Sequence, residues 1–368
     1  MTEDTPGKGL ELAAAIHEAR DRGDARGVIV AELEFQAFGC DGVGSPLYGR
    51  LLRAAAEDAR ADGVTWEILR DRSDDPPFSA LALRLMAAVH RLVLTGAAPE
   101  LGGFYPSVGG DANRPGAWVA LERVMRDHVA ELRDGVMRPC QTNEPGRSAA
   151  LLGGFLLTAR ETGLPLRVLE VGASAGLNLR WDQFRYVHGD RAWGPQASAV
   201  VIDGVFEAAP PLDVPARVVE RRGCDPRPQD PTAEETRLNL RSSAWPDQLE
   251  RFRTLEGALE LAARVPVEVD QADGAAWLEQ QLAEPRPGVA TVVYHSIVMQ
   301  YMTDAQRARL RDVITAAGGR ASAAAPLAWL SMEPGTGQAD VHLASWPGGE
   351  KRLVATSGFH GRPVNWLA

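Results

Sequence analysis

The sequence is poor in cysteine and has no long apolar run. Cys40, Cys140 and Cys224 are far apart and fit no metal-ligand spacing, so we expect reduced thiols and no bound metal. No apolar stretch approaches the ~18 residues that a membrane span needs, and residues 1–21 lack the apolar core of a signal peptide. These absences predict a cytoplasmic protein without a membrane partner.

The chain also lacks an excess of basic charge. Its 368 residues carry 39 basic and 49 acidic side chains, a net charge of −10. A protein that binds duplex nucleic acid needs a basic face to displace counterions from phosphate, so no nucleic-acid partner is expected. Hydrophobic residues make up 45%, which is enough for one large domain or two ordinary ones.

The first part of the chain has the periodicity of helices. Apolar residues recur at three- and four-residue spacing in segments separated by proline and glycine clusters, which are residues 10–22, 46–62, 79–95 and 117–133. We predict a helical N-terminal or cap domain over residues 1–145.

From residue 146 the pattern changes to alternating helices and strands. Five apolar segments predict buried strands: LRVLEVG, ARVVERRGCD, PVEVDQAD, VATVVYHSIV and LAWLSMEP. VHLASW and KRLVATS, joined by the turn PGGE, predict an antiparallel hairpin. Residues 146–368 are therefore predicted to form an α/β domain with a doubly wound, mostly parallel sheet and an antiparallel C-terminal edge.

The stretch LEVGASAGLNL fits three interpretations. Residues 172–176 match the G-x-S-x-G elbow of a serine hydrolase, with Ser174 as nucleophile, although no oxyanion segment precedes them. A dinucleotide-binding loop would need G-x-G-x-x-G, and that spacing is absent. Glu170, Gly172, Ser174 and Gly176 differ at one position from the E-x-G-x-G-x-G loop that holds S-adenosylmethionine, and we favour this third interpretation.

Acidic residues follow the next two predicted strands. In the S-adenosylmethionine interpretation, Asp225 would accept both hydroxyls of the ribose, and Asp273 would read the adenine amino group. The distance from Glu170 to Asp225 is 55 positions, whereas about 20 is usual for such an acid. Residues 186–216 are therefore predicted to be an insertion, and Glu220 and Asp203 remain alternatives for the ribose-binding acid.

Further polar side chains surround this region in the sequence. The loop QTNEPGR supplies Gln141, Asn143, Glu144 and Arg147, and its arginine could pair bidentately with a carboxylate. The same loop is also compatible with a polar helix cap.

The end of the fourth predicted strand offers a possible base. His295 has an ordinary pKa near 6.5 and could act as a general base, or it could be a hydrogen-bonded core histidine. Tyr294 and Tyr301 are candidates for shaping a substrate pocket.

The α/β half resembles class I S-adenosylmethionine-dependent methyltransferases, in the glycine loop and in VVYHSIVMQYMTDAQRARL. The resemblance implies a Rossmann-like, seven-stranded sheet with an antiparallel C-terminal hairpin, S-adenosylmethionine as cofactor and S-adenosylhomocysteine as product. The residues that it implies for cofactor binding are Glu170, Gly172, Ser174, Gly176, Asn178, Asp225 and Asp273.

Almost the whole chain also resembles an uncharacterised domain-of-unknown-function family of bacteria, frequent in actinobacteria. GSPLYGRLL, FYPSVGG, QTNEPGR and RRGCDPRPQDPT carry this resemblance. The expected function is methyl transfer to a small or medium-sized acceptor. The alternatives are a non-catalytic cofactor- or metabolite-binding protein and a serine hydrolase that uses Ser174.

Overall fold

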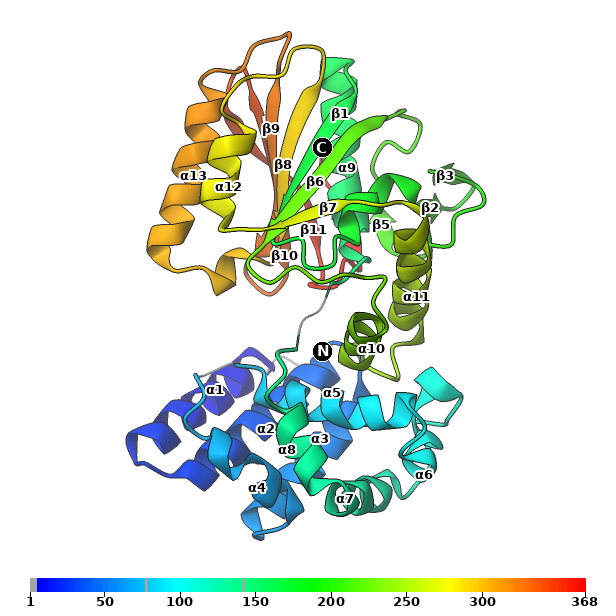
Figure 1. The fold of residues 1–368 in the computed structure, drawn as a ribbon, viewed down its shortest axis with the longest axis vertical. Coiled ribbons are helices and arrows are strands. Elements are labelled where there is room, and N and C mark those ends of the chain that lie inside the picture. The colour runs from blue at the N-terminus through cyan, green and yellow to red at the C-terminus, as the bar shows by residue number, and fades with distance from the viewer. Residues whose placement is uncertain (1–4, 77–78, 141–142) are drawn as a thin grey trace. The chain divides into compact units, whose positions relative to one another are not determined.

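The computed structural model describes residues 5–76, 79–140 and 143–368, and the chain divides into two compact units (Figure 1). Residues 1–142 and 237–252 form the first unit, and residues 143–236 and 253–368 form the second. The first unit thus takes a short segment from the middle of the α/β half.

The described part of the first unit contains helices and no strand. The α-helices are α1 (Thr5–Asp21), α2 (Ala25–Gly42), α3 (Pro46–Arg60), α4 (Val64–Leu69), α5 (Leu81–Leu94), α6 (Pro99–Gly102), α7 (Ala117–Asp127), α8 (Val129–Gly135) and most of α10 (Glu234–Ser243). Two 3-10 helices, η1 (Arg70–Arg72) and η2 (Pro106–Val108), lie between them. The apolar faces of α2 to α8 form one core, to which Trp245 of the later segment also belongs.

Asp247 of that later segment caps a helix far from it in sequence. Its carboxylate accepts hydrogen bonds from the Ser45 hydroxyl (2.5 Å) and from the Leu47 backbone N–H (2.9 Å), at the start of α3. The first N–H groups of a helix have no partner within it, so a distant carboxylate supplies the acceptor here.

A nine-stranded sheet is the centre of the second unit. Its strands are β1 (Leu166–Val171), β5 (Phe206–Ala208), β6 (Val218–Asp225), β7 (Glu268–Gln271), β8 (Ala290–Ser296), β9 (Leu327–Pro334), β10 (Ala339–Trp346), β11 (Glu350–Ser357) and β12 (Val364–Trp366). The order is β5-β12-β11-β10-β9-β8-β1-β6-β7. The strands from β7 to β9 in this order pair in parallel, which confirms the prediction of an α/β unit with a mostly parallel sheet.

The sheet has nine strands and not the expected seven, because its antiparallel edge is longer. The PGGE turn joins β10 and β11 as an antiparallel pair, as predicted. β12 then pairs antiparallel with β11, and β5 pairs parallel with β12. β5 comes from the predicted insertion, residues 186–216.

The rest of that insertion forms a small sheet of its own, in the order β3-β2-β4. Its strands are β2 (Arg185–His188), β3 (Arg191–Trp193) and β4 (Val201–Ile202). The ring of Trp193 stacks on Trp181, with centroids 5.3 Å apart. This contact fastens the small sheet to η3 (Asn178–Gln183), the 3-10 helix that follows the glycine loop.

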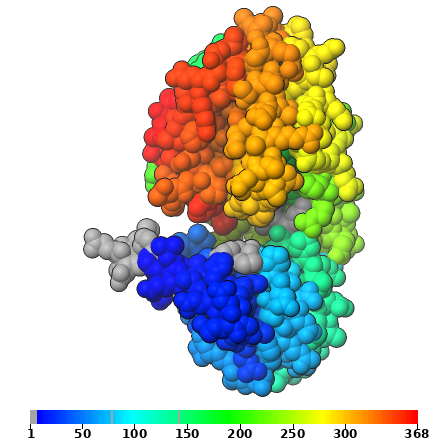
Figure 2. Space-filling model, turned by 90° about the vertical axis from the view of Figure 1, so that its left-hand side faces the viewer, coloured from blue at the N-terminus to red at the C-terminus, as the bar shows by residue number. Residues whose placement is uncertain are grey.

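Helices cover both faces of the main sheet. α9 (Arg147–Thr162) lies on one face and packs against β8–β11, while α12 (Gly274–Gln281) and α13 (Asp304–Gly318) lie on the other (Figure 1). Alternate strand residues point to opposite faces: Val293 packs with α12 and α13, whereas Tyr294 contacts Phe155 of α9. Figure 2 shows α13, in orange, on the surface of the second unit. α11 (Leu249–Arg264) and η4 (Met299–Tyr301) complete the chain.

Candidate functional site

The glycine loop leaves the carboxyl end of β1 in an unusual backbone conformation. Gly172, Ser174 and Gly176 have φ values of +73°, +53° and +66°. Glycine adopts such values at little cost, and a serine there is uncommon. The N–H groups of Gly172 and Ala173 donate to the Cys224 carbonyl at 2.9 and 3.0 Å. The loop is therefore folded back onto the end of β6.

Asp225 fixes the middle of this loop. Its carboxylate accepts hydrogen bonds from the backbone N–H of Ser174 (2.9 Å) and from that of Arg227 (2.8 Å). Of the three acids considered for ribose binding, Asp225 alone lies at the carboxyl end of β6. Glu220 lies nearer the amino end and pairs with Arg167 at 2.8 Å, and Asp203 is exposed beside the small sheet.

Glu170 is a buried carboxyl beneath the loop. Its side chain points to the α9 face, where the Tyr294 hydroxyl on the neighbouring strand donates to it at 3.0 Å. Burial raises the pKa of Glu170 to about 8, against opposing effects of the Tyr294 hydrogen bond and of the charges of Arg147 and Arg180. The carboxyl is therefore mostly protonated at neutral pH in the protein alone.

Arg180 holds the far end of the loop, a role that the sequence did not indicate. Arg180 is 2% exposed, and its guanidinium donates to the carbonyls of Gly176 and Val265, both at 2.7 Å. Burial lowers the pKa of Arg180 to about 10. Because arginine is common on helix surfaces, nothing in the local pattern distinguished this one.

The segment after Thr142 is hydrogen-bonded to the residues that follow the glycine loop. Asn143 accepts from the Leu177 N–H (2.9 Å), and Asn178 donates to the Glu144 carbonyl (3.2 Å) while accepting from the Ser148 hydroxyl (2.7 Å). The structure thus brings Asn143, Glu144 and Asn178 together beside the glycine loop. Gln141 lies outside the described residues.

Arg147 contacts two backbone carbonyls. Its Nε donates to the Phe359 carbonyl at 3.0 Å, and its Nη1 donates to the Ser296 carbonyl, at the end of β8, at 3.2 Å. These bonds hold the start of α9 against the carboxyl end of the sheet.

His295 is buried between two fixed side chains. Its Nε2 accepts from the Trp329 indole N–H at 3.0 Å, so in the neutral ring the proton is on Nδ1, which donates to Glu333 at 2.6 Å. Both nitrogens therefore have protein partners, as in a hydrogen-bonded core histidine.

Glu333, which the sequence did not indicate, organises the loop after β8. Its carboxylate also accepts from the backbone N–H groups of Val298 and Met299, at 3.0 and 3.3 Å. The residue before them, Ile297, has a φ of +55°, which is a strained conformation for a β-branched residue. Glu333 thus stabilises a strained turn at the end of the strand next to β1.

The loops after β1 and β8 pack against each other. A Cβ added to Gly172 would lie 2.6 Å from Cγ2 of Val298. Gly172 is therefore required by this packing as well as by its φ.

Two other predicted site residues, Asp273 and Tyr301, differ from this buried, hydrogen-bonded cluster. Asp273 is the N-cap of α12, where its carboxylate accepts from the Ala276 N–H at 3.0 Å. Tyr301, in η4, is 80% exposed.

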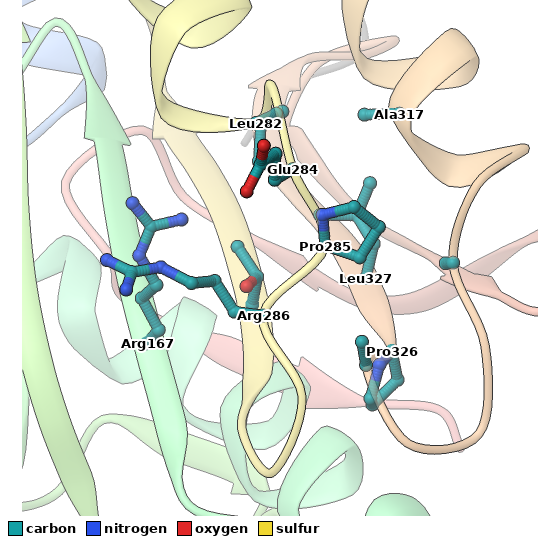
Figure 3. Close-up of a pocket in the computed structure, with 11 residues that line it drawn as sticks. Arg167, Leu282, Glu284, Pro285, Arg286, Ala317, Pro326 and Leu327 are labelled. Atoms are coloured by element: carbon teal, nitrogen blue, oxygen red, sulfur yellow. The ribbon is translucent and has the colours of Figure 1, made fainter.

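A small pocket lies at the amino ends of β1, β8 and β9, at the other end of these strands from the glycine loop (Figure 3). Arg167, Arg286 and Thr291 line it, and its cavity volume of about 20 Å³ is the size of one water molecule. Because it lies at the amino ends of the strands, this pocket is separate from the glycine loop, and its volume leaves little room for a ligand. The Arg167 side chain is also already hydrogen-bonded to Glu220 and Gln281 (2.8 Å each).

The described residues contain no group of three or more His, Cys, Asp or Glu side chains that could hold a metal ion. None of their helices combines the length and the apolar character of a membrane span.

Comparison with known proteins identifies the family. No curated protein and no solved structure matches the chain. Residues 30–366 match the family described as "Uncharacterized protein conserved in bacteria (DUF2332)", which confirms the resemblance to a bacterial domain-of-unknown-function family. Because the match covers most of the chain, the protein belongs to this family.

Proposed function

We propose that this protein is an S-adenosylmethionine-dependent methyltransferase that acts on a small or medium-sized acceptor. One observation carries the proposal: the parallel strands run in the order β7-β6-β1-β8-β9. Following the chain, β6 and β7 are added on one side of β1, and β8 and β9 are then added on its other side. Open α/β sheets bind ligands at such a reversal point, outside the carboxyl ends of the strands. The glycine loop lies there, as in a Rossmann-like methyltransferase.

The residues at this point suit the chemistry of the cofactor. Asp225 is half-buried and uses one lone pair of each carboxylate oxygen on a backbone N–H, which leaves acceptor capacity for two ribose hydroxyls. Glu170 is a protonated acid that a nearby cation would ionise, so it suits the ammonium group of the amino-acid end. The cofactor would supply an electrophilic methyl group.

The protein's own contribution would be alignment and exclusion of water. His295 is not available as a base, because Trp329 occupies Nε2 and Glu333 accepts the Nδ1 proton. We therefore expect an acceptor whose nucleophilic atom needs no deprotonation by His295.

The alternative of a non-catalytic binding protein has support from glycine packing. Added Cβ atoms at Gly172 and Gly176 would meet Val298 and Val267 at 2.6 and 2.9 Å, so the fold itself requires these glycines whether or not catalysis occurs. A serine hydrolase at Ser174 has weaker support. It would need a histidine base from among His295, His342 and His360, and both ring nitrogens of His295 are engaged.

Calorimetric titration with S-adenosylhomocysteine tests the proposal. We expect saturable binding, weakened at least tenfold in D225N and unchanged in D203N, the matched control at an exposed aspartate. Absence of binding at millimolar ligand, with folded protein, would overturn the proposal. Binding without methyl transfer to a broad panel of small acceptors would favour the non-catalytic alternative.

A further inference from the structure

A serine and a histidine are hydrogen-bonded inside the first unit, far in sequence from the glycine loop. The Nε2 atom of His90, on α5, lies 2.8 Å from Oγ of Ser107 in η2, and Nδ1 lies 3.2 Å from the Ser242 carbonyl on α10. All three residues belong to the first unit.

The partners decide the protonation of the ring. A carbonyl oxygen can only accept, so Nδ1 of His90 carries a proton and donates to Ser242. Burial lowers the pKa of His90 to about 4, and the ring is therefore neutral at pH 7. Nε2 must then be the acceptor, and the Ser107 hydroxyl donates to it.

This arrangement has the three parts of an activated nucleophile. The hydroxyl is hydrogen-bonded to a neutral imidazole nitrogen, and a third group orients the ring from its other nitrogen. Ser107 is half-buried and Val108 beside it is exposed, whereas His90 is fully buried. The nucleophile thus lies nearer to solvent than its base.

A second observation points to a ligand at the same cluster. The hydroxyl of Tyr105 is buried and has no hydrogen-bond partner among the described residues, and the Tyr105 ring lies 5.4 Å from that of His90. An unsatisfied buried hydroxyl costs about 1–3 kcal/mol. A bound carbonyl or oxyanion would supply the missing acceptor.

We propose that Ser107 and His90 form a second reactive site, a serine–histidine pair that hydrolyses small carboxylic esters. Ser107 Oγ bonds to the ester carbonyl carbon as its proton passes to His90 Nε2, and the alcohol leaves with that proton. Water then attacks the acyl-serine, giving its proton to Nε2, and Ser107 recovers a proton as the carboxylic acid is released. The aromatic surroundings, Tyr105 and Phe252, suit an apolar acyl group. This site does not depend on the proposed methyltransferase function.

A fluorophosphonate probe on the full-length protein, followed by mapping of the labelled peptide by mass spectrometry, tests the pair. We expect the label on Ser107, its loss in S107A, and a labelling rate lowered about 100-fold in H90Q, because a positioned base contributes that much or more. S73A, at another half-buried serine of the first unit, should label like the wild type. A burst of p-nitrophenol from p-nitrophenyl acetate should depend on the same two side chains.

Absence of label from Ser107 in folded wild-type protein would overturn the proposal, and so would labelling of H90Q at the wild-type rate. A label on Ser174 alone would do the same and would favour the hydrolase interpretation of the glycine loop. The wild-type mapping decides the question even where a variant fails to fold. Titration with S-adenosylhomocysteine is a separate measurement, so failure of one proposal is distinguishable from failure of the other.

Discussion

At the scale of single residues, the buried carboxyl of Glu170 ties stability to pH. Its pKa of about 8 in the folded protein is above the ordinary value of 4.5, so the folded state holds this proton more tightly than the unfolded state does. The contribution of this proton to stability is complete below about pH 4.5 and is lost as the pH rises through about 8.

We therefore expect E170Q to resemble the wild type at pH 5 and to be more stable at pH 9, by at least about 1 kcal/mol, since one pKa unit corresponds to about 1.4 kcal/mol. Glutamine can still accept from the Tyr294 hydroxyl. Urea unfolding followed by tryptophan fluorescence measures the difference. E161Q, at an exposed ion pair with Arg352, is the control and should keep the wild-type pH dependence. An unchanged pH dependence in E170Q would show that burial does not control this group.

At the scale of elements, the contact between the loops after β1 and β8 can be separated from backbone strain. Gly172 and Gly163 have similar φ values, +73° and +66°, but nothing lies within 4 Å of a Cβ added to Gly163. G163A should lower the free energy of unfolding only by the cost of a left-handed backbone at a non-glycine residue, about 1–2 kcal/mol. G172A should lower it by at least twice as much, because its Cβ would also collide with Val298.

The second substitution V298A separates the cost of the left-handed backbone from the cost of the contact with Val298. In the G172A background it should restore part of the lost stability, because it removes the atom 2.6 Å from the new Cβ. Thermal unfolding of the wild type, G172A, V298A and the double variant measures this coupling. Equal losses in G163A and G172A would contradict close packing of the two loops.

Asp273 allows a helix cap to be distinguished from a cofactor contact. Asparagine is as good an N-cap as aspartate, whereas alanine at this position costs about 0.5–2 kcal/mol. We expect D273A to be destabilised by about 1 kcal/mol and D273N to stay within a few tenths of the wild type. If Asp273 also binds adenine, D273N should weaken binding of S-adenosylhomocysteine at unchanged stability. Unchanged affinity in D273N would leave Asp273 with a capping role alone.

At the scale of the whole molecule, the first unit is discontinuous in sequence. Residues 237–252 supply it with the acceptor for His90, the Asp247 cap of α3, and Trp245 in the core. A fragment of residues 1–142 lacks all three contacts. We expect it to unfold without a cooperative transition in a circular dichroism melt, whereas the full chain melts cooperatively. A sharp transition in the fragment would show that the later segment is dispensable.

Much of this architecture was predictable from local pattern. Five parallel strands, the hairpin at PGGE and the glycine loop at the end of a strand followed from apolar alternation and turn residues. The pairing of β12 and β5 beyond that hairpin was not predictable, because these two strands are three residues long each and too short to show a period.

The candidate site divides in the same way. Position along the chain placed Glu170 and Asp225 near the carboxyl ends of strands, and the structure brings both to the glycine loop. Choosing Asp225 over Glu220 needed the register of β6. The engagement of His295 by Trp329 and Glu333 depends on β9, more than 30 residues away.

By itself the sequence determined where helices and strands form, which faces of them are apolar, and where glycine permits a reversed backbone, because these follow from interactions between near neighbours. Tertiary structure alone decided the pKa of Glu170, the burial of Arg180, the hydrogen bond from Ser107 to His90 and the membership of residues 237–252 in the first unit. Desolvation and hydrogen-bond partners depend on which distant segments meet, and no local pattern records that.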